Sequence, residues 1–335
     1  DGDLIGRLDG EDVLKLSLSG GTIAAGNSGS VSVMVELLSN LPHGKDLDEL
    51  TLSGIEVIAI DSDGTASDPG TVGVTVDDDS PDVSLGGGKF AIEGGNAISG
   101  SWSTESGADE EGATREIAFN GGEPQAFEVG QTYQLDQGEL TFNADGTWTF
   151  VPGTNLDHSG GKVPVSFELI KTDGDGDRER ASHTIKIKDG AGPTPGGEDG
   201  QGGTASLVVN ERGLREDADS NKLSDSAELH FTAGSDDIVS FVFGNSDTIT
   251  VDGLDGVLTW HEVDGDLIGR LDGEDVLKLS LSGGTIAAGN SGSVSVMVEL
   301  LSNLPHGKDL DELTLSGIEV IAIDSDGTAS DPGTV

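Results

Sequence analysis

The stretch VLKLSLS, residues 13–19, alternates apolar and polar side chains from its first leucine onward. In an extended chain its three leucines share one face, and its lysine and serines share the other. This period of two predicts a β-strand with one buried face.

Similar runs recur along the whole chain and are separated by turns rich in Gly, Asp and Asn. Runs of this length and spacing predict an all-β protein built of antiparallel immunoglobulin-like β-sandwich domains. Only KDLDEL, residues 45–50 and again 308–313, resembles a helical turn. The predicted strands are 13–19, 31–37, 55–60, 72–76, 146–150, 165–170, 183–188, 206–209, 227–233, 238–243 and 257–262.

The strand at 13–19 belongs to a long repeat, because residues 1–72 are identical to residues 264–335. The 15-residue segment 190–204 is rich in Gly and Pro and predicts a linker. We therefore predict one complete sandwich at 82–189 and a longer one at 205–335. Residues 1–77 are then the C-terminal half of the longer domain type.

A half sandwich cannot close a two-sheet core by itself. The segment 1–77 is then an open half-domain, or exchanges strands with another molecule, or displaces its twin at 264–335 from residues 205–263. We expect the last two segments to pair locally, since contiguous strands close with less loop entropy.

The chain has 62 acidic and 17 basic residues among 335, a formal charge of −45. Nucleic acid and anionic membrane surfaces would be repelled, so neither is an expected partner. This excess of acidic residues could form the solvated surface of a halophile's protein, or it could supply a set of calcium ligands. Calcium is favoured because the aspartates gather in short loops, at 61–64, 77–82, 173–177, 217–221 and 234–237.

Other chemistry finds little support in the sequence. Cysteine is absent, so disulfides and thiolate metal sites are excluded. No apolar run approaches the ~20 residues of a membrane-spanning helix, so no direct membrane insertion is expected. Nucleotide-binding and hydrolase motifs are also missing, and we expect no enzyme. The three tryptophans and Tyr133 are isolated in strands and are expected in cores.

The acidic loops fall where domains should meet. In such a sandwich the loop before the final strand faces the linker that precedes the domain. The linker and loop at the first junction would therefore converge, and so much like charge requires a cation such as Ca²⁺. The residues concerned are Asp77, Asp78, Asp79, Asp173, Asp175 and Asp177.

The same reasoning brings Asp324 and Asp326, copies of Asp61 and Asp63, to the linker after Asp189, with Glu211 as a further ligand. One more loop, 217–228, resembles the ligand spacing of an EF-hand without its glycine. Its candidate ligands are Asp217, Asp219, Asn221, Asp225 and Glu228.

Four segments together resemble the tandem extender repeats of RTX adhesins, which are surface proteins exported by the type I pathway. They are SLVVNERGL (206–214), SAELHFTAGSDDIVSFVFG (226–244), VIAIDSDGTASDPGTVGVTVDDDSPDV (57–83) and FELIKTDGDGDRERASHTIKIKDG (167–190). The resemblance implies calcium-dependent immunoglobulin-like domains in a stalk at the bacterial cell surface, with calcium stiffening the junctions. The glycine-aspartate nonapeptides that name the family are absent from this chain.

The expected function is that of a non-catalytic spacer that projects a distal binding region for adhesion or biofilm formation. Its expected partners are calcium ions and neighbouring repeats of the same protein. The alternative is a calcium-dependent glycan-binding adhesive module, which would require an exposed tryptophan.

Overall fold

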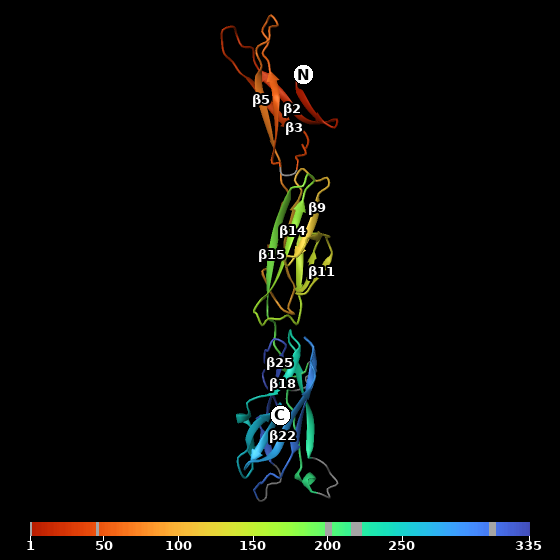
Figure 1. The fold of residues 1–335 in the computed structure, drawn as a ribbon, viewed down its shortest axis with the longest axis vertical. Coiled ribbons are helices and arrows are strands. Elements are labelled where there is room, and N and C mark those ends of the chain that lie inside the picture. The colour runs from red at the N-terminus through yellow and green to blue at the C-terminus, as the bar shows by residue number, and fades with distance from the viewer. Residues whose placement is uncertain (1, 45–46, 198–202, 216–222, 308–312) are drawn as a thin grey trace.

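The computed structural model describes residues 2–44, 47–197, 203–215, 223–307 and 313–335. Three groups of β-sheets follow one another along the long axis of the molecule (Figure 1). We call them the first part (1–77), the middle part (82–189) and the last part (205–335). The chain is all-β, and the only helical elements among the described residues are two short 3₁₀ turns in the last part.

The middle part is a sandwich of two five-stranded sheets, ordered β10-β9-β14-β15-β7 and β11-β12-β13-β8-β6. All its pairs are antiparallel except β15 with β7. Aromatic side chains fill the space between the sheets, including Trp148, whose Nε1 donates to the Gly86 carbonyl at 2.9 Å. The strands are β6 Asp82–Gly87, β7 Phe90–Ile92, β8 Ile98–Glu105, β9 Thr114–Phe119, β10 Gln125–Ala126, β11 Thr132–Leu135, β12 Gly138–Phe142, β13 Thr147–Pro152, β14 Val163–Thr172 and β15 Arg178–Lys188.

In the last part, a six-stranded sheet that includes β16 from the preceding linker, ordered β16-β17-β23-β22-β21-β20, packs against the smaller sheets β18-β25-β26 and β19-β24. Residues 205–263 supply four strands that pair with residues 264–335, so the expected local pairing is confirmed. The elements are β16 Thr194–Pro195, η1 Glu211–Leu214, β17 Ser224–Thr232, β18 Ile238–Phe243, η2 Ser246–Thr248, β19 Thr250–Asp252, β20 Thr259–Val263, β21 Asp266–Leu271, β22 Glu274–Gly283, β23 Ser291–Leu300, β24 Thr314–Ser316, β25 Glu319–Asp324 and β26 Gly333–Thr334.

The first part has a three-stranded sheet, β1-β2-β3, and a hairpin of β4 with β5. Its buried core is small and consists of Val13, Leu14, Leu16 and Val74. The strands are β1 Leu4–Leu8, β2 Glu11–Gly20, β3 Val31–Leu37, β4 Glu49–Val57 and β5 Gly70–Asp77.

Three local predictions were wrong or incomplete. The helical turn predicted at 45–50 contributes its last two residues to β4, and its repeat at 308–313 lies almost wholly outside the described residues. Residues 206–209 form no ladder, because the Val208 amide donates to the Asp225 side chain instead of to a strand. The predicted linker is partly sheet, since β16 at 194–195 pairs with β17.

Candidate cation sites at two junctions

The first junction joins the first and middle parts. It is built from the linker after β5, the loop 173–177 between β14 and β15, the loop 106–113 between β8 and β9, and the segment after β3. Two overlapping groups of ligand atoms lie here, each within 4.8 Å of one another. One group is His43, Asp78 and Asp175, and the other is Asp78, Asp79 and Asp109.

Backbone amides hold these carboxylates in place. Both oxygens of Asp79 accept from the Ala108 amide, at 2.9 and 3.1 Å. Asp173 Oδ1 accepts from the Gly176 and Asp177 amides at 3.0 and 2.7 Å, which closes the loop. The Asn40 side chain donates to Asp109 and so links the first part to the middle part directly.

Burial makes the negative charge of this group costly. Asp173 is only 3 % exposed, and burial raises its pKa to about 6, with Asp175 contributing in the same direction. Burial also raises the pKa of Asp78, and the charges of Asp175 and Asp109 add to that shift while His43 opposes it. Lys171 is buried as well, and its charge interacts favourably with that of Asp173. Several carboxylates, some of them buried, thus share one site with little positive charge.

His43 faces this group with one ring nitrogen. Its Nε2 lies 3.2 Å from the Val76 carbonyl, to which it can donate, and its Nδ1 lies 3.1 Å from Asp78 Oδ1. The second contact has the distance of an ion pair but lacks the alignment of a hydrogen bond, so Nδ1 counts among the unpartnered buried atoms. A charged histidine would offset one of the carboxylates.

The second junction joins the middle and last parts. It is built from the residues that follow β7 and β15, the loop between β13 and β14, the loop between β17 and β18, and the turn after β25. Here too, two groups of ligand atoms overlap within 4.8 Å. They are Glu93, His158 and Asp189, and Asp189, Asp236 and Asp326.

Hydrogen bonds across this junction fix its geometry. The His158 amide donates to Asp326 Oδ2 at 3.0 Å, and the Asn155 amide donates to the Ser235 carbonyl at 2.9 Å. Asn155 Oδ1 accepts from the Ser325 hydroxyl at 3.0 Å and from the Asp237 amide at 3.2 Å. Close approach requires a glycine at position 234, because a Cβ there would lie 1.6 Å from the Ala191 carbonyl oxygen.

Glu93 is the most perturbed group at the second junction. Its side chain is buried, its Oε1 accepts from the Leu156 amide at 2.5 Å, and its Oε2 lies 3.3 Å from His158 Nδ1. Burial raises its pKa to about 7. Burial likewise raises the pKa of Asp236 and of Asp324, and neighbouring carboxylates contribute to both shifts.

Within the described residues, the two junctions hold all of the unpartnered buried side-chain polar atoms. Eight side-chain nitrogen and oxygen atoms in the described chain are buried without a hydrogen-bond partner; seven belong to residues of these groups, and the eighth belongs to Asp173, which interacts with Asp175. Buried polar groups are normally satisfied, so such a concentration calls for a partner of positive charge. The residues are His43, Asp109, Asp173 and Asp175 at the first junction, and Glu93, His158 and Asp236 at the second.

Several predicted ligands are brought together as expected. Asp78, Asp79 and Asp175 meet at the first junction, and Asp173 interacts with Asp175 there. Asp189 and Asp326 meet at the second, where Asp324 lies close enough for its charge to interact with theirs.

Other predicted ligands lie elsewhere. Asp77 is exposed at the end of β5 opposite Glu49, and Asp177 contributes its backbone to the 173–177 loop. Asp61 and Asp63 form the same turn as their copies but are exposed and meet no other part.

The expectation for Glu211 was wrong. Its Oε1 accepts from the Leu304 amide at 2.6 Å, and its Oε2 lies 3.9 Å from His306 Nε2. It therefore lies beside a different loop and outside the group around Asp189, because residues 206–214 turn through η1 instead of ending a strand at the junction.

The predicted loop at 217–228 lies only partly within the described residues, and from Ser224 onward it is strand instead of loop. Asp225 and Glu228 lie within β17, and Asp225 accepts from the Val208 amide. Asp217, Asp219 and Asn221 lie outside the described residues.

Five residues of these groups were not predicted. Asp236 belongs to an acidic cluster that the sequence displays at 234–237, and Asp109 precedes two glutamates. Glu93, His43 and His158 are single residues in loops, and no local pattern distinguishes them. Only the folded chain brings them to the junctions.

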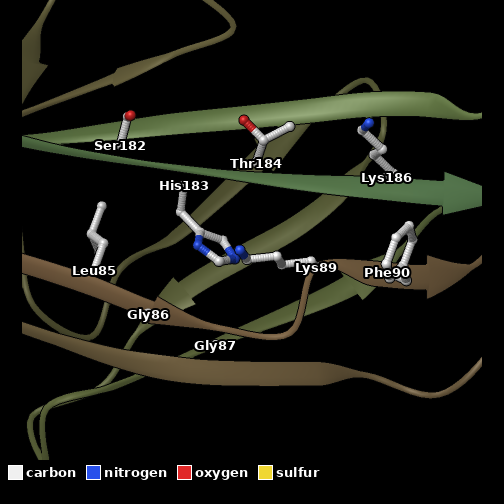
Figure 2. A pocket seen from close by; sticks show the side chains of 9 residues that line it. All are labelled: Leu85, Gly86, Gly87, Lys89, Phe90, Ser182, His183, Thr184 and Lys186. Carbon is white, nitrogen blue, oxygen red and sulfur yellow. The ribbon is translucent and has the colours of Figure 1, made fainter.

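The hollow in Figure 2 lies away from both junctions, between β15 and the segment that joins β6 to β7. Its lining includes Phe90, Lys89 and Lys186, and it contains no carboxylate. The tryptophans do not line it. Trp148 is fully buried, and Trp102 and Trp260 pack against the cores, as predicted.

No family model matches the chain, and no curated protein matches it either. Among solved structures, a Bacteroides ovatus mixed-linkage glucan utilization locus protein, SGBP-B, is 13% identical, with 77% of this chain and 48% of that chain covered and a TM-score of 0.21. Protocadherin Gamma B2 extracellular cadherin domains 3-6 are 11% identical, with 95% and 91% covered and a TM-score of 0.28. DIP-gamma IG1+IG2 is 9% identical, with 77% and 96% covered and a TM-score of 0.25.

This chain thus spans about half the length of the first of these proteins. Likenesses this weak carry no functional argument. The sheets themselves define the chain as all-β with immunoglobulin-like sandwiches. No helix in the described residues has the length and apolar character needed to cross a membrane.

Proposed function

We propose that this chain is a spacer segment of a bacterial surface adhesin, an extender repeat of the RTX type, whose junctions are stiffened by calcium. The observation that carries the proposal is the confinement of the unpartnered buried side-chain atoms of the described chain to its two junctions. A cation held there ties adjacent sandwiches together, whereas its loss leaves carboxylates that repel one another.

The donor set fits calcium. Ca²⁺ takes about 6–8 oxygen ligands in flexible geometry. The first junction combines carboxylates from the linker with carboxylates from loops of the middle part, and the second combines Asp189 with carboxylates from loops of the middle and last parts. Asp78, Asp79 and Asp109 would hold the ion at the first junction, and Asp189, Asp236 and Asp326 at the second.

In this proposal the chain is extracellular and non-catalytic, and its partners are calcium and neighbouring repeats. The glycan-binding alternative is disfavoured because a stacking platform for a sugar needs an exposed ring, whereas Trp148 is fully buried and Trp102 and Trp260 are partly buried against the cores.

Matched variants within the repeat can test the proposal. Asp326 lies at the second junction, and its copy Asp63 forms the same turn in the open. With free calcium at ten times the dissociation constant, each occupied site should add about 1.4 kcal/mol to the free energy of unfolding. Asp326→Asn should lose this gain for the second junction, whereas Asp63→Asn should keep it.

Small-angle scattering provides the second readout. The parent chain should have a longer maximum dimension in calcium than in chelator, and magnesium or sodium at equal ionic strength should not reproduce the change. Equal dimensions and equal melting temperatures in calcium and chelator would overturn the proposal. Stabilisation by any salt at the same ionic strength would instead support a halophile's acidic surface.

A further inference from the structure

The repeated sequence is buried in the last part and exposed in the first. Val294 and Leu300 on β23 are 0 % and 3 % exposed, whereas their copies Val31 and Leu37 on β3 are 46 % and 52 % exposed. Leu267 is 4 % exposed, and its copy Leu4 is 58 % exposed. The first part thus carries a broad apolar face that the same residues do not show elsewhere. Patches of this kind mark interaction surfaces in soluble proteins.

The last part shows what covers this face. Residues 205–263 lay β17 against β23 and β20 against β21 in the large sheet. They also lay β18 against β25 and β19 against β24 on the opposite side of the core. The inward side chains of this segment, among them Leu229 and Phe231, are fully buried against the repeated sequence.

The first part keeps the strand edges that such a segment would fill. β3 is the outer strand of its sheet, and its copy β23 carries β17 on the corresponding edge. β4 pairs only with β5, and its copies in the last part pair with β18 and β19. Exposed edges of this kind readily accept another strand.

The covering segment also carries a carboxylate to a defined loop. In the last part, Glu211 accepts from the Leu304 amide and lies beside His306. The copies of these two residues are Leu41 and His43, and His43 belongs to the cation group of the first junction. A second Glu211 placed in the same way would therefore stand on the Nε2 side of the His43 ring, whose Nδ1 faces Asp78 of that group.

We propose that the apolar face of residues 1–77 binds a second copy of the segment 205–263, and that Glu211 of that copy completes the cation site of the first junction. The covering of the face depends only on the strand edges and the apolar residues. The role of Glu211 rests, in addition, on the proposed cation function.

The test adds residues 205–263 directly before Asp1, which gives the first copy the same connection that Val263 makes to Asp264 in the last part. In chelator, the parent chain should bind a dye specific for exposed apolar surface, and the extended chain should lose most of that binding. The added Trp260 should show the blue-shifted emission of a partly buried indole. A matched control carries Leu229→Asp and Phe231→Asp in the added copy only, and should bind dye as the parent does.

Calcium titration of the extended chain tests the second half of the proposal. The first junction should bind about tenfold more tightly than in the parent, since one charged ligand is added. Glu211→Gln in the added copy should remove this gain and leave dye binding low. Equal affinity in the extended chain and in this variant would overturn the role of Glu211.

Three further outcomes bear on the covering of the apolar face. Persistent dye binding by the extended chain would overturn the covering. A parent chain that is a dimer without dye binding would show that two copies of 1–77 cover each other, and would overturn it too. Absence of calcium binding in every chain, with dye binding lost on extension, would refute the proposed function and leave the covering intact.

Discussion

Residues 1–72 and 264–335 have the same sequence and share their local structure, yet they differ in what surrounds them. β1 pairs with β2 in the register in which β21 pairs with β22, and both pairs are irregular at the same place, Gly6/Arg7 and Gly269/Arg270. The turn held by Asp61 is likewise repeated by Asp324. The pairing of this hairpin and the form of this turn thus follow from neighbours in sequence, whereas burial follows from the rest of the chain.

The largest contrast should come from truncating one leucine in each copy. Leu300→Ala removes a buried side chain and should lower the free energy of unfolding of the last part by about 2–5 kcal/mol. Leu37→Ala removes an exposed one and should cost less than about 1 kcal/mol in the first part. Denaturant unfolding followed by circular dichroism measures both, and Trp260 fluorescence identifies the transition of the last part. Equal costs would show that the first copy is covered in solution.

The turn at 324–326 meets the middle part, whereas its copy at 61–63 is exposed, so stability should depend on pH through the groups at the second junction. Glu93 lies beside His158, whose amide donates to Asp326 in the second copy's turn, and burial raises the pKa of Glu93 from 4.5 to about 7. Between these values the folded chain binds a proton that the unfolded chain has released. Stability in chelator is therefore greatest below pH 4.5 for this group and falls as the pH rises towards 7.

The expected loss across that window is about 1–3 kcal/mol. Burial alone would lower the pKa of His158, but the Leu156 carbonyl and the charge of Glu93 outweigh burial and raise it. The folded chain therefore favours protonated His158, and this contribution to stability is also lost as the pH rises. Glu93→Gln should flatten the profile recorded by thermal unfolding at successive pH values in chelator. A profile unchanged by Glu93→Gln would place the titration elsewhere.

A smaller contrast concerns one hydroxyl. Ser325 donates to Asn155 across the second junction, whereas its copy Ser62 lies in an exposed turn. Ser325→Ala should weaken the coupling between the middle and last parts by about 0.5–1.5 kcal/mol, the net value of one hydrogen bond. Ser62→Ala should have no effect on any transition. Calorimetry measures this coupling through the temperature difference between the melting transitions of the middle and last parts. That difference should increase for Ser325→Ala and stay the same for Ser62→Ala.

The smallest effect is expected where the copies do not differ. Arg7 pairs with Asp12 and Arg270 with Asp275, both at 2.5 Å and both on the surface. Asp12→Asn and Asp275→Asn should leave the melting transitions unchanged, since exposed ion pairs are weak and screened by salt. A clear shift for Asp275→Asn alone would show that the surroundings of the last part act even on this exposed pair.

Much of the fold could be predicted from short patterns. The runs 31–37 and 238–243 are strands with the predicted bounds, because alternation and turn residues act locally. The run 206–209 is also largely apolar and was predicted as a strand, but it forms no ladder, since the Val208 amide donates to the Asp225 carboxylate. The candidate sites were partly predictable, because Asp78 and Asp175 lie in acidic loops whose positions follow from strand order.

The sequence by itself determined the strands, the acidic turns and the repeat, all of which depend on residues close together in the chain. Only the tertiary structure decided which copy of a repeated feature is buried and which copy of an acidic turn lies at a junction. Asp326 is drawn into a buried junction while Asp63 stays in water, although both close the same turn. Glu93 and His158 join the cation groups from loops without any distinguishing pattern. The reason is that burial and charge density are properties of what packs against a residue, and the local sequence does not contain its neighbours.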